Sequence, residues 1–119
     1  MKDFRTLSVW QKSYELTLLI YRSTRSFPKE ELFGLTSQIR RAASSIGANI
    51  AEGCGRNSNG DFSRFLQIAF GSANEFDRHL ILARDLDLLS EENFVMLNDR
   101  VDEVKKMLGS LIRKVQSDR

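Results

Sequence analysis

The sequence has very little cysteine, proline and histidine, with one residue of each among 119. Cys54 has no second cysteine to pair with, which excludes an internal disulfide and a zinc site built on paired cysteines. The single proline, Pro28, leaves room for long uninterrupted helices. His79 is the only imidazole, so any catalytic nucleophile that needs a histidine base would have to lie beside it. These shortages exclude disulfide-stabilised scaffolds and zinc ribbons.

Long hydrophobic runs are also missing. The longest, residues 16–21, is interrupted by Thr17 and is far too short to span a bilayer. The charged N-terminus is followed by no apolar core of the kind that a signal peptide has. We therefore expect a cytoplasmic protein without membrane contact. A chain of 119 residues is long enough to bury a core, and we expect one domain over residues 1–119.

Charge is nearly balanced, at +2 overall. Residues 1–60 carry nine Lys/Arg against five Asp/Glu, or +4, whereas residues 61–119 carry nine against eleven, or −2. A difference of this size is compatible with a basic surface but does not establish one.

Two helices are predicted in the first half of the chain. The first begins after Ser8, because Ser8 and Gln11 have the spacing of a capping box, and Pro28 ends it. Large apolar residues at three- and four-residue steps then predict a helix from residue 35 to about residue 53. Residues 55–60 are rich in glycine, asparagine and serine, which is typical of a turn.

Two longer helices are predicted in the second half. Apolar residues alternate steps of four and three from Phe62 to Ala83, and again from Phe94 to Val115, with Ser90 as the N-cap of the last helix. Four helices with short connections and this spacing pack best as an all-α, antiparallel, up-down-up-down four-helix bundle.

The predicted second helix is unusual because so many of its residues are small. A helix that accepts Gly47 in its interior, at about 1 kcal/mol relative to Ala, is expected to let another backbone come close. A polar row also follows this helix, and such a row is either a solvated face or a buried hydrogen-bonded network. We predict a buried network, in which Glu52→Ala would cost about 3 kcal/mol. Its members are Gln38, Arg41, Asn49 and Glu52.

Catalytic and metal-binding interpretations find little support. His79 is the fourth residue after Glu75, but a di-iron bundle needs Glu-x-x-His on two helices and further glutamates on the others. We therefore interpret the two residues as structural or surface partners. Cys54 lies between two glycines, and we interpret it as an inert small residue because Arg56 is the only nearby cation in the sequence. No catalytic residue, metal or cofactor is predicted.

Arginines give the best functional candidates. Arg40 and Arg41 point about 100° apart on a helix, so they cannot both join the polar row. Arg41 belongs to the row, where Glu75 and Gln67 of the third helix are possible partners, and Arg40 is left for a phosphate or a partner. Arg56 and Arg64 flank the glycine-rich turn, whose backbone NH groups suit an anion. The predicted nucleic-acid contacts are Arg40, Arg56 and Arg64.

Several segments together resemble a known bacterial family. They include Gly-Leu-Thr-Ser-Gln-Ile-Arg-Arg-Ala at residues 34–42 and Asn-Ile-Ala-Glu-Gly at residues 49–53. The other matching pieces are residues 7–12, 27–28, 31, 45–46, 64–66 and 71–72. In this order they resemble the four-helix bundle proteins encoded in intervening sequences of large-subunit ribosomal RNA genes. A related branch is the accessory protein of diversity-generating retroelements, which is similar to a basic pentameric barrel that works with a reverse transcriptase and RNA.

The resemblance implies a homo-oligomer, most often a pentamer, that is suspected of binding nucleic acid and has no established catalytic activity. We therefore expect a non-enzymatic module that binds itself and, through surface Arg and Lys, RNA or DNA. The alternative is a protein-interaction scaffold without nucleic-acid contact, in which the second helix is the subunit interface. A metal-dependent bundle enzyme is a more distant alternative.

Overall fold

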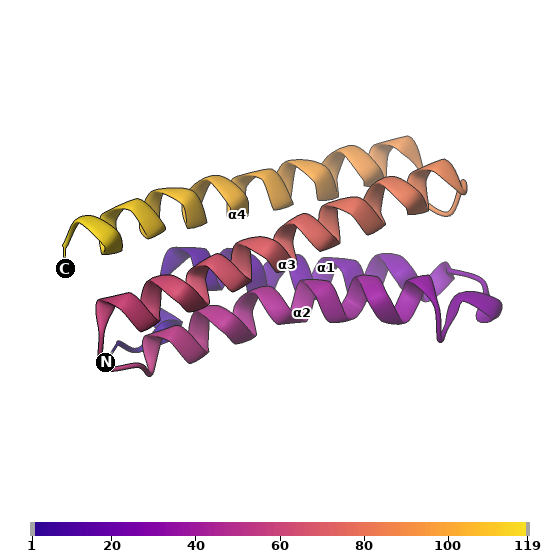
Figure 1. Ribbon diagram of the computed structural model, residues 1–119. Coiled ribbons are helices and arrows are strands. Elements are labelled where there is room, and N and C mark those ends of the chain that lie inside the picture. Colours follow the sequence, from indigo (N-terminus) through magenta and orange to yellow (C-terminus); the bar gives the residue numbers. More distant parts are fainter. Residues whose placement is uncertain (1, 119) are drawn as a thin grey trace.

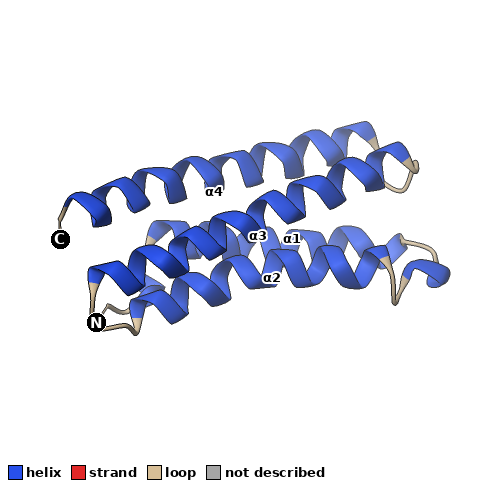
Figure 2. Ribbon diagram, in the orientation of Figure 1, coloured by secondary structure: helices blue, strands red, loops and turns tan. Residues whose placement is uncertain are grey.

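The computed structural model describes residues 2–118, and this part of the chain is helical without strands (Figure 2). Its four long helices are α1 (Ser8–Ser23), α2 (Leu35–Cys54), α3 (Asn59–Asp85) and α4 (Glu91–Ser117). Consecutive helices run in opposite directions along a body of 46 × 23 × 20 Å (Figure 1). Both α1 and α3 pack against α2 and α4, so α1 and α3 occupy opposite corners. The predicted all-α four-helix bundle is confirmed.

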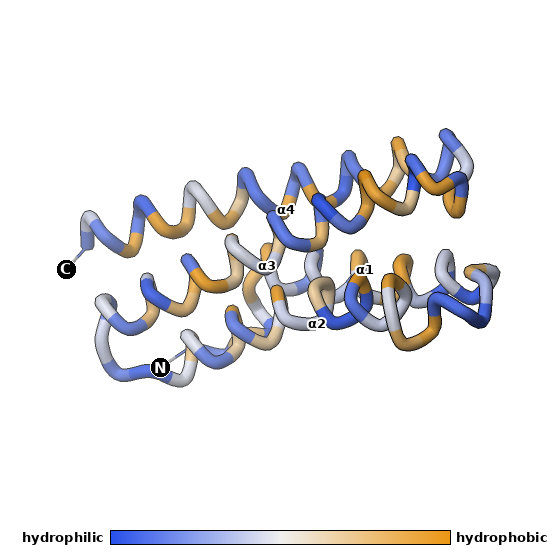
Figure 3. The backbone as a smooth tube through the Cα atoms, turned by 45° about the vertical axis from the view of Figure 1, so that its right-hand side comes forward, coloured by the Kyte–Doolittle hydropathy of each residue, from blue (hydrophilic) through white to orange (hydrophobic). Residues whose placement is uncertain are grey.

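One hydrophobic core runs along the bundle, because each helix turns apolar residues inward at steps of three or four positions, although Leu111 and Ile112 of α4 are only partly buried. The hydrophobic and hydrophilic segments accordingly alternate along every helix in Figure 3. The largest side chains with no measurable exposure come from all four helices: Leu16, Ile20, Ile39, Ile46, Ile50, Leu66, Phe76, Leu80, Leu97, Val101, Val104 and Leu108.

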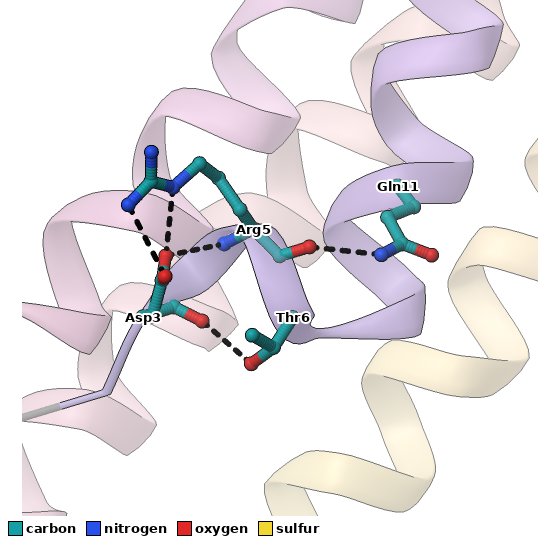
Figure 4. Close-up of polar contacts among 4 residues, drawn as sticks. All are labelled: Asp3, Arg5, Thr6 and Gln11. Carbon is teal, nitrogen blue, oxygen red and sulfur yellow. Dashed lines mark hydrogen bonds and ion pairs between the residues drawn. The ribbon is translucent and has the colours of Figure 1, made fainter.

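The start of α1 differs from the prediction. Ser8 is the first helical residue, its N-cap is Leu7, and no side chain caps this end. The Gln11 amide instead donates to the carbonyl of Arg5 at 2.8 Å (Figure 4). The chain reaches α1 through a 3-10 helix, Phe4–Thr6, which Asp3 caps by accepting from the backbone NH of Arg5. The predicted capping box is wrong because this preceding turn already receives the Gln11 side chain.

The other helix ends follow the local chemistry of the sequence. Phe27, the residue before proline, is extended (φ −65°, ψ 148°), and α1 passes into a 3-10 helix, Thr24–Ser26, before it. Ser90 caps α4 as predicted, by accepting from the backbone NH of Asn93. Ser58 caps α3 in the same way through Asp61, so α3 begins three residues earlier than predicted.

Small residues of α2 do allow close approach. A Cβ atom on Gly53 would lie 3.0 Å from atoms of Phe62 and Phe65 and 3.3 Å from the carbonyl oxygen of Phe62. A Cβ atom on Gly47 would lie 3.1 Å from the Ser13 hydroxyl and 3.3 Å from the Trp10 indole nitrogen. The start of α3 therefore packs against α2 at Gly53, and side chains of α1 pack against α2 at Gly47.

Candidate nucleic-acid interface

The polar row of α2 does not form the single buried network that we expected. The Arg41 guanidinium donates to Gln38 at 2.9 Å, and Asn49 donates to the carbonyl and hydroxyl of Ser45. Glu52 pairs with Arg56 at 2.7 Å, and the Glu52 side chain is 56% exposed. Glu52 and Arg41 are about three helical turns apart, so each pairs with a neighbour one turn away instead.

One inter-helix contact of this row was expected. The Arg41 guanidinium lies 3.9 Å from the Glu75 carboxylate of α3, although the Arg41 side chain is 69% exposed. The same Glu75 carboxylate lies 3.4 Å from Nε2 of His79. Glu75 and His79 are thus structural partners, and no group of three metal-ligating side chains occurs among residues 2–118.

Arg40 is held by α1. Its Nε donates to the Thr24 hydroxyl at 2.8 Å, and its guanidinium lies 4.7 Å from the centre of the Tyr21 ring. A further long hydrogen bond, 3.4 Å, joins it to the Tyr21 carbonyl. Arg40 therefore binds the last turn of α1, where backbone carbonyls lack helical partners and attract a cation. It lies about 21 Å along α2 from Cys54, where the helix ends, and is therefore far from Arg56.

Arg56 and Arg64, by contrast, are brought together. Their guanidinium groups lie 4.7 and 4.6 Å from the centre of the same aromatic ring, that of Phe65. Arg56 also pairs with Glu52, and Arg64 lies 4.0 Å from Asp61. Each arginine is thus partly neutralised by a carboxylate. Both guanidinium groups also make cation–π contacts with the ring of Phe65.

Cys54 is buried at the same end of the bundle and makes no disulfide. Burial raises the pKa of its thiol, and the nearby Lys2 offsets this only in part. Because the thiolate is the reactive form, a raised pKa makes this cysteine a poor nucleophile. The buried position agrees with our interpretation of Cys54 as an inert small residue.

The second half of α4 contains a set of cations that sequence reasoning missed. From Lys105 onward the helix has Lys105, Lys106, Arg113 and Lys114, whereas Glu91 to Glu103 contains five acidic residues and one arginine. Lys105 pairs with Asp77 of α3 at 3.0 Å. The other three are exposed and have no carboxylate within 4.0 Å among residues 2–118.

Grooves lie on both sides of these cations. One, of about 460 Å³, separates the start of α1 from α4, and Leu7, Val9, Met107 and Leu111 give it an apolar floor between Lys106 and Lys114. The other, of about 470 Å³, lies between α3 and α4. Phe70, Lys105, Lys106, Gly109, Ser110 and Arg113 line this second groove. Lys106 and Ser110 border both grooves and form the ridge between them.

The signal for this surface was present in the sequence but was averaged away. Counted over residues 61–119, the charge is −2, because the −4 of the first half of α4 cancels the +4 of its second half and residues 61–90 carry −2. Counting the charge of each half of the last helix separately would have revealed the basic second half. The α2–α3 turn and the last turns of α4 lie at the same end of the bundle (Figure 1), so Arg56 and Arg64 share this end with Arg113 and Lys114.

Comparisons with known proteins agree with the fold and the motifs. The family described as 23S rRNA-intervening sequence protein matches residues 5–110. The chain belongs to this family. A crystal structure of a protein of unknown function from the S23 ribosomal protein family of Bacteroides thetaiotaomicron is similar to it, with a TM-score of 0.81 and 31% identity. That similarity covers 88% of this chain and 95% of the other. No curated protein matches.

Membership of the intervening sequence protein family establishes the resemblance that the motifs indicated, and it assigns no reaction. The solved relative is itself of unknown function. No helix between residues 2 and 118 is both long and apolar enough to cross a membrane. Function must therefore be argued from the surface of the bundle.

Proposed function

We propose that this intervening sequence protein is a non-enzymatic, homo-oligomeric module that binds RNA or DNA through phosphate contacts. The observation that carries the proposal is the set of exposed cations Lys106, Arg113 and Lys114, which have no carboxylate partner within residues 2–118. Cations without protein partners are available to neutralise phosphates, which is the main source of affinity in sequence-independent binding.

Assembly strengthens this proposal. One chain offers three such cations on α4 together with the partly neutralised Arg56 and Arg64, which is too few for tight binding. A ring of copies multiplies the surface, and a strand that touches two subunits gains from their effective concentration. The family resemblance implies five copies. Exposed apolar side chains on α1 and α3, among them Tyr14, Leu18 and Ile68, support self-association.

The experiment is a salt titration of binding. A fluorescently labelled RNA of mixed sequence and a DNA of the same length are titrated with the protein at several salt concentrations, and anisotropy is read. We expect modest affinity that falls steeply with salt, and little dependence on sequence. Replacing Lys106, Arg113 and Lys114 together by Ala should weaken binding to all sequences and lower the slope of log K against log salt by about 2 for single strands.

A matched control uses cations elsewhere. Arg22, Arg25 and Lys29 are exposed, also have no carboxylate within 4.0 Å among residues 2–118, and lie at the other end of the bundle. Their triple replacement by Ala changes net charge equally and should leave the slope unchanged. If the wild-type protein binds neither RNA nor DNA at low ionic strength, the nucleic-acid proposal fails and the scaffold alternative replaces it.

A further inference from the structure

We infer that the groove between α3 and α4 is a site for single-stranded nucleic acid, in which a base stacks on Phe70 while Lys106 and Arg113 hold the adjacent phosphates. The inference rests on the proposed function and adds to it a site and a preference for single strands. An aromatic ring and flanking cations in one groove are the components that bind single strands without sequence selection.

Phe70 is the aromatic residue best placed for this role. It is half-buried, packs against the core and lines two adjoining cavities, of about 470 and 390 Å³. Phe65, one and a half turns earlier on α3, is engaged by the guanidinium groups of Arg56 and Arg64. Trp10 and Tyr14 stack on each other, with ring centroids 5.3 Å apart, in a groove that has no charged lining residue.

The groove walls favour a phosphate-bearing ligand. Lys106 and Arg113 stand about two helical turns apart on α4 on either side of Gly109, so phosphates can be contacted on both sides of a stacked base. Gly109 keeps the space between them open, because the nearest atom to a Cβ built there is the movable Arg113 Nη1, at 3.5 Å. Volumes of this size fall within the range of small-ligand pockets. Lys105 is neutralised by Asp77 and contributes less.

A double-stranded helix keeps its bases stacked inside and cannot place one on Phe70. The groove should therefore distinguish single strands from duplexes, whereas the exposed cations outside it should bind both. This difference separates the site from a general basic surface.

The test compares a labelled single-stranded oligouridylate with a labelled RNA duplex by fluorescence anisotropy at fixed low salt. Phe70→Leu keeps the apolar bulk and removes the ring, and should weaken single-strand binding by a factor of about 5 to 150. Gly109→Leu fills the groove while leaving Phe70 itself unchanged in sequence, and it should also weaken single-strand binding. Both variants should bind the duplex as the wild type does. Phe33→Leu removes a ring that is 92% exposed in the α1–α2 connection, and as the aromatic control it should keep single-strand affinity within about twofold of the wild type.

Three results would overturn the site. In the first, Phe70→Leu and Gly109→Leu bind the oligouridylate as tightly as the wild type and with the same salt dependence. This result would refute the groove site but not the proposed function. Equal losses for single strand and duplex would assign the effect to the general basic surface. A changed oligomer mass for Gly109→Leu in light scattering would assign the groove to a second copy of the chain. Absence of all wild-type binding would instead refute the proposed function itself.

Discussion

Individual arginines of this protein differ in what holds them, and their partners decide what they can do. Arg40 is bound by the hydroxyl of Thr24, just after α1, and by the carbonyl and ring of Tyr21, whereas among residues 2–118 Arg113 donates only to the Ser110 hydroxyl, at 3.3 Å. Removing a cation that binds other protein groups costs stability, and removing a solvated one costs little. The two residues should therefore respond differently to the same substitution.

We expect Arg40→Ala to lower the free energy of unfolding by about 1–2 kcal/mol, because it leaves the Thr24 hydroxyl without its donor and removes the contact with Tyr21. Urea denaturation followed by circular dichroism measures this. Arg22→Ala, at an exposed position on α1, is the control and should change stability by less than about 0.5 kcal/mol. A variant as stable as the wild type would show that Arg40 is not an anchor of α1.

Cys54 gives a pH-dependent prediction. Burial raises the pKa of its thiol above the ordinary value of 9.0, so at pH 8 the folded protein should react with a disulfide reagent more slowly than a cysteine in a peptide. Reaction in denaturant should be fast. Because the unfolded chain releases the thiol proton first, the free energy of unfolding should decline as the pH rises above about 9. Equal reaction rates in the native and denatured protein would contradict the burial of this thiol.

At the scale of helices, the glycines test where backbones meet. Gly71, on the exposed side of α3, has nothing within 4 Å of a built Cβ atom, whereas Gly53 has atoms at 3.0 Å. Gly71→Ala should stabilise the protein by about 0.5–1 kcal/mol through helix propensity, and Gly53→Ala should destabilise it by about 1–3 kcal/mol. Thermal melting should show shifts of opposite sign. A lower melting temperature for Gly71→Ala would instead indicate that a second copy approaches α3 there.

The polar row of α2 gives a second test at this scale. Glu52 and Arg56 pair with exposed fractions of 56% and 41%, so Glu52→Ala should cost about 1 kcal/mol or less, not the 3 kcal/mol expected for a buried pair. Arg56→Ala is the matched partner variant and should have a similar small effect. Urea denaturation measures the free energy of unfolding, and it is repeated at protein concentrations below and above the one at which the chains assemble. A large loss that appears only for the assembled protein would place this row at a subunit interface.

The helices were predictable from the sequence because apolar periodicity is a local signal. Residues 35–53 were predicted as a helix and α2 runs from Leu35 to Cys54, and the cap at Ser90 was also found in advance. The start of α1 was not predicted correctly. The Gln11 amide donates to the carbonyl of Arg5 in a preceding turn, and apolar periodicity does not indicate that turn. The partner of a side chain depends on which donors and acceptors the fold brings near it, and these are not adjacent in the sequence.

The candidate surface was harder to predict for the same reason. Arg40, Arg56 and Arg64 were chosen for their positions in the sequence, but whether a cation is available depends on the carboxylates and rings that the fold brings near it. Phe70 and Arg113 are 43 positions apart and meet only because α3 and α4 pack side by side. No local pattern in the sequence contains that juxtaposition.

For the whole molecule, the arrangement of exposed apolar residues bears on how copies would assemble. Tyr14, Leu18 and Tyr21 are 51%, 37% and 43% exposed and lie on one face of α1, at i, i+4 and i+7. Ile68 and Leu82 are 42% and 46% exposed on α3. Because α1 and α3 occupy opposite corners, these two faces cannot meet within a chain. Different faces that meet between copies make a heterologous interface, which can close into a ring.

We therefore expect light scattering to give a homo-oligomer, about five times the 13.7 kDa of one chain if the family resemblance holds. Leu18→Arg on α1 and Ile68→Arg on α3 should each reduce the assembly to monomers, because each places a charge in the interface. Val95→Arg, at an exposed position on α4, is the control and should keep the wild-type mass.

Mixing the two disrupted variants decides whether the interface is heterologous. The Leu18→Arg chain keeps its α3 face and the Ile68→Arg chain keeps its α1 face, so one intact interface can form between them and no further copy can be added. The mixture should therefore contain a species of twice the monomer mass, while each variant alone remains a monomer. An interface of α1 with α1 would instead leave Ile68→Arg fully assembled and unaffected by mixing. A monomeric wild-type protein at micromolar concentration would contradict self-association altogether.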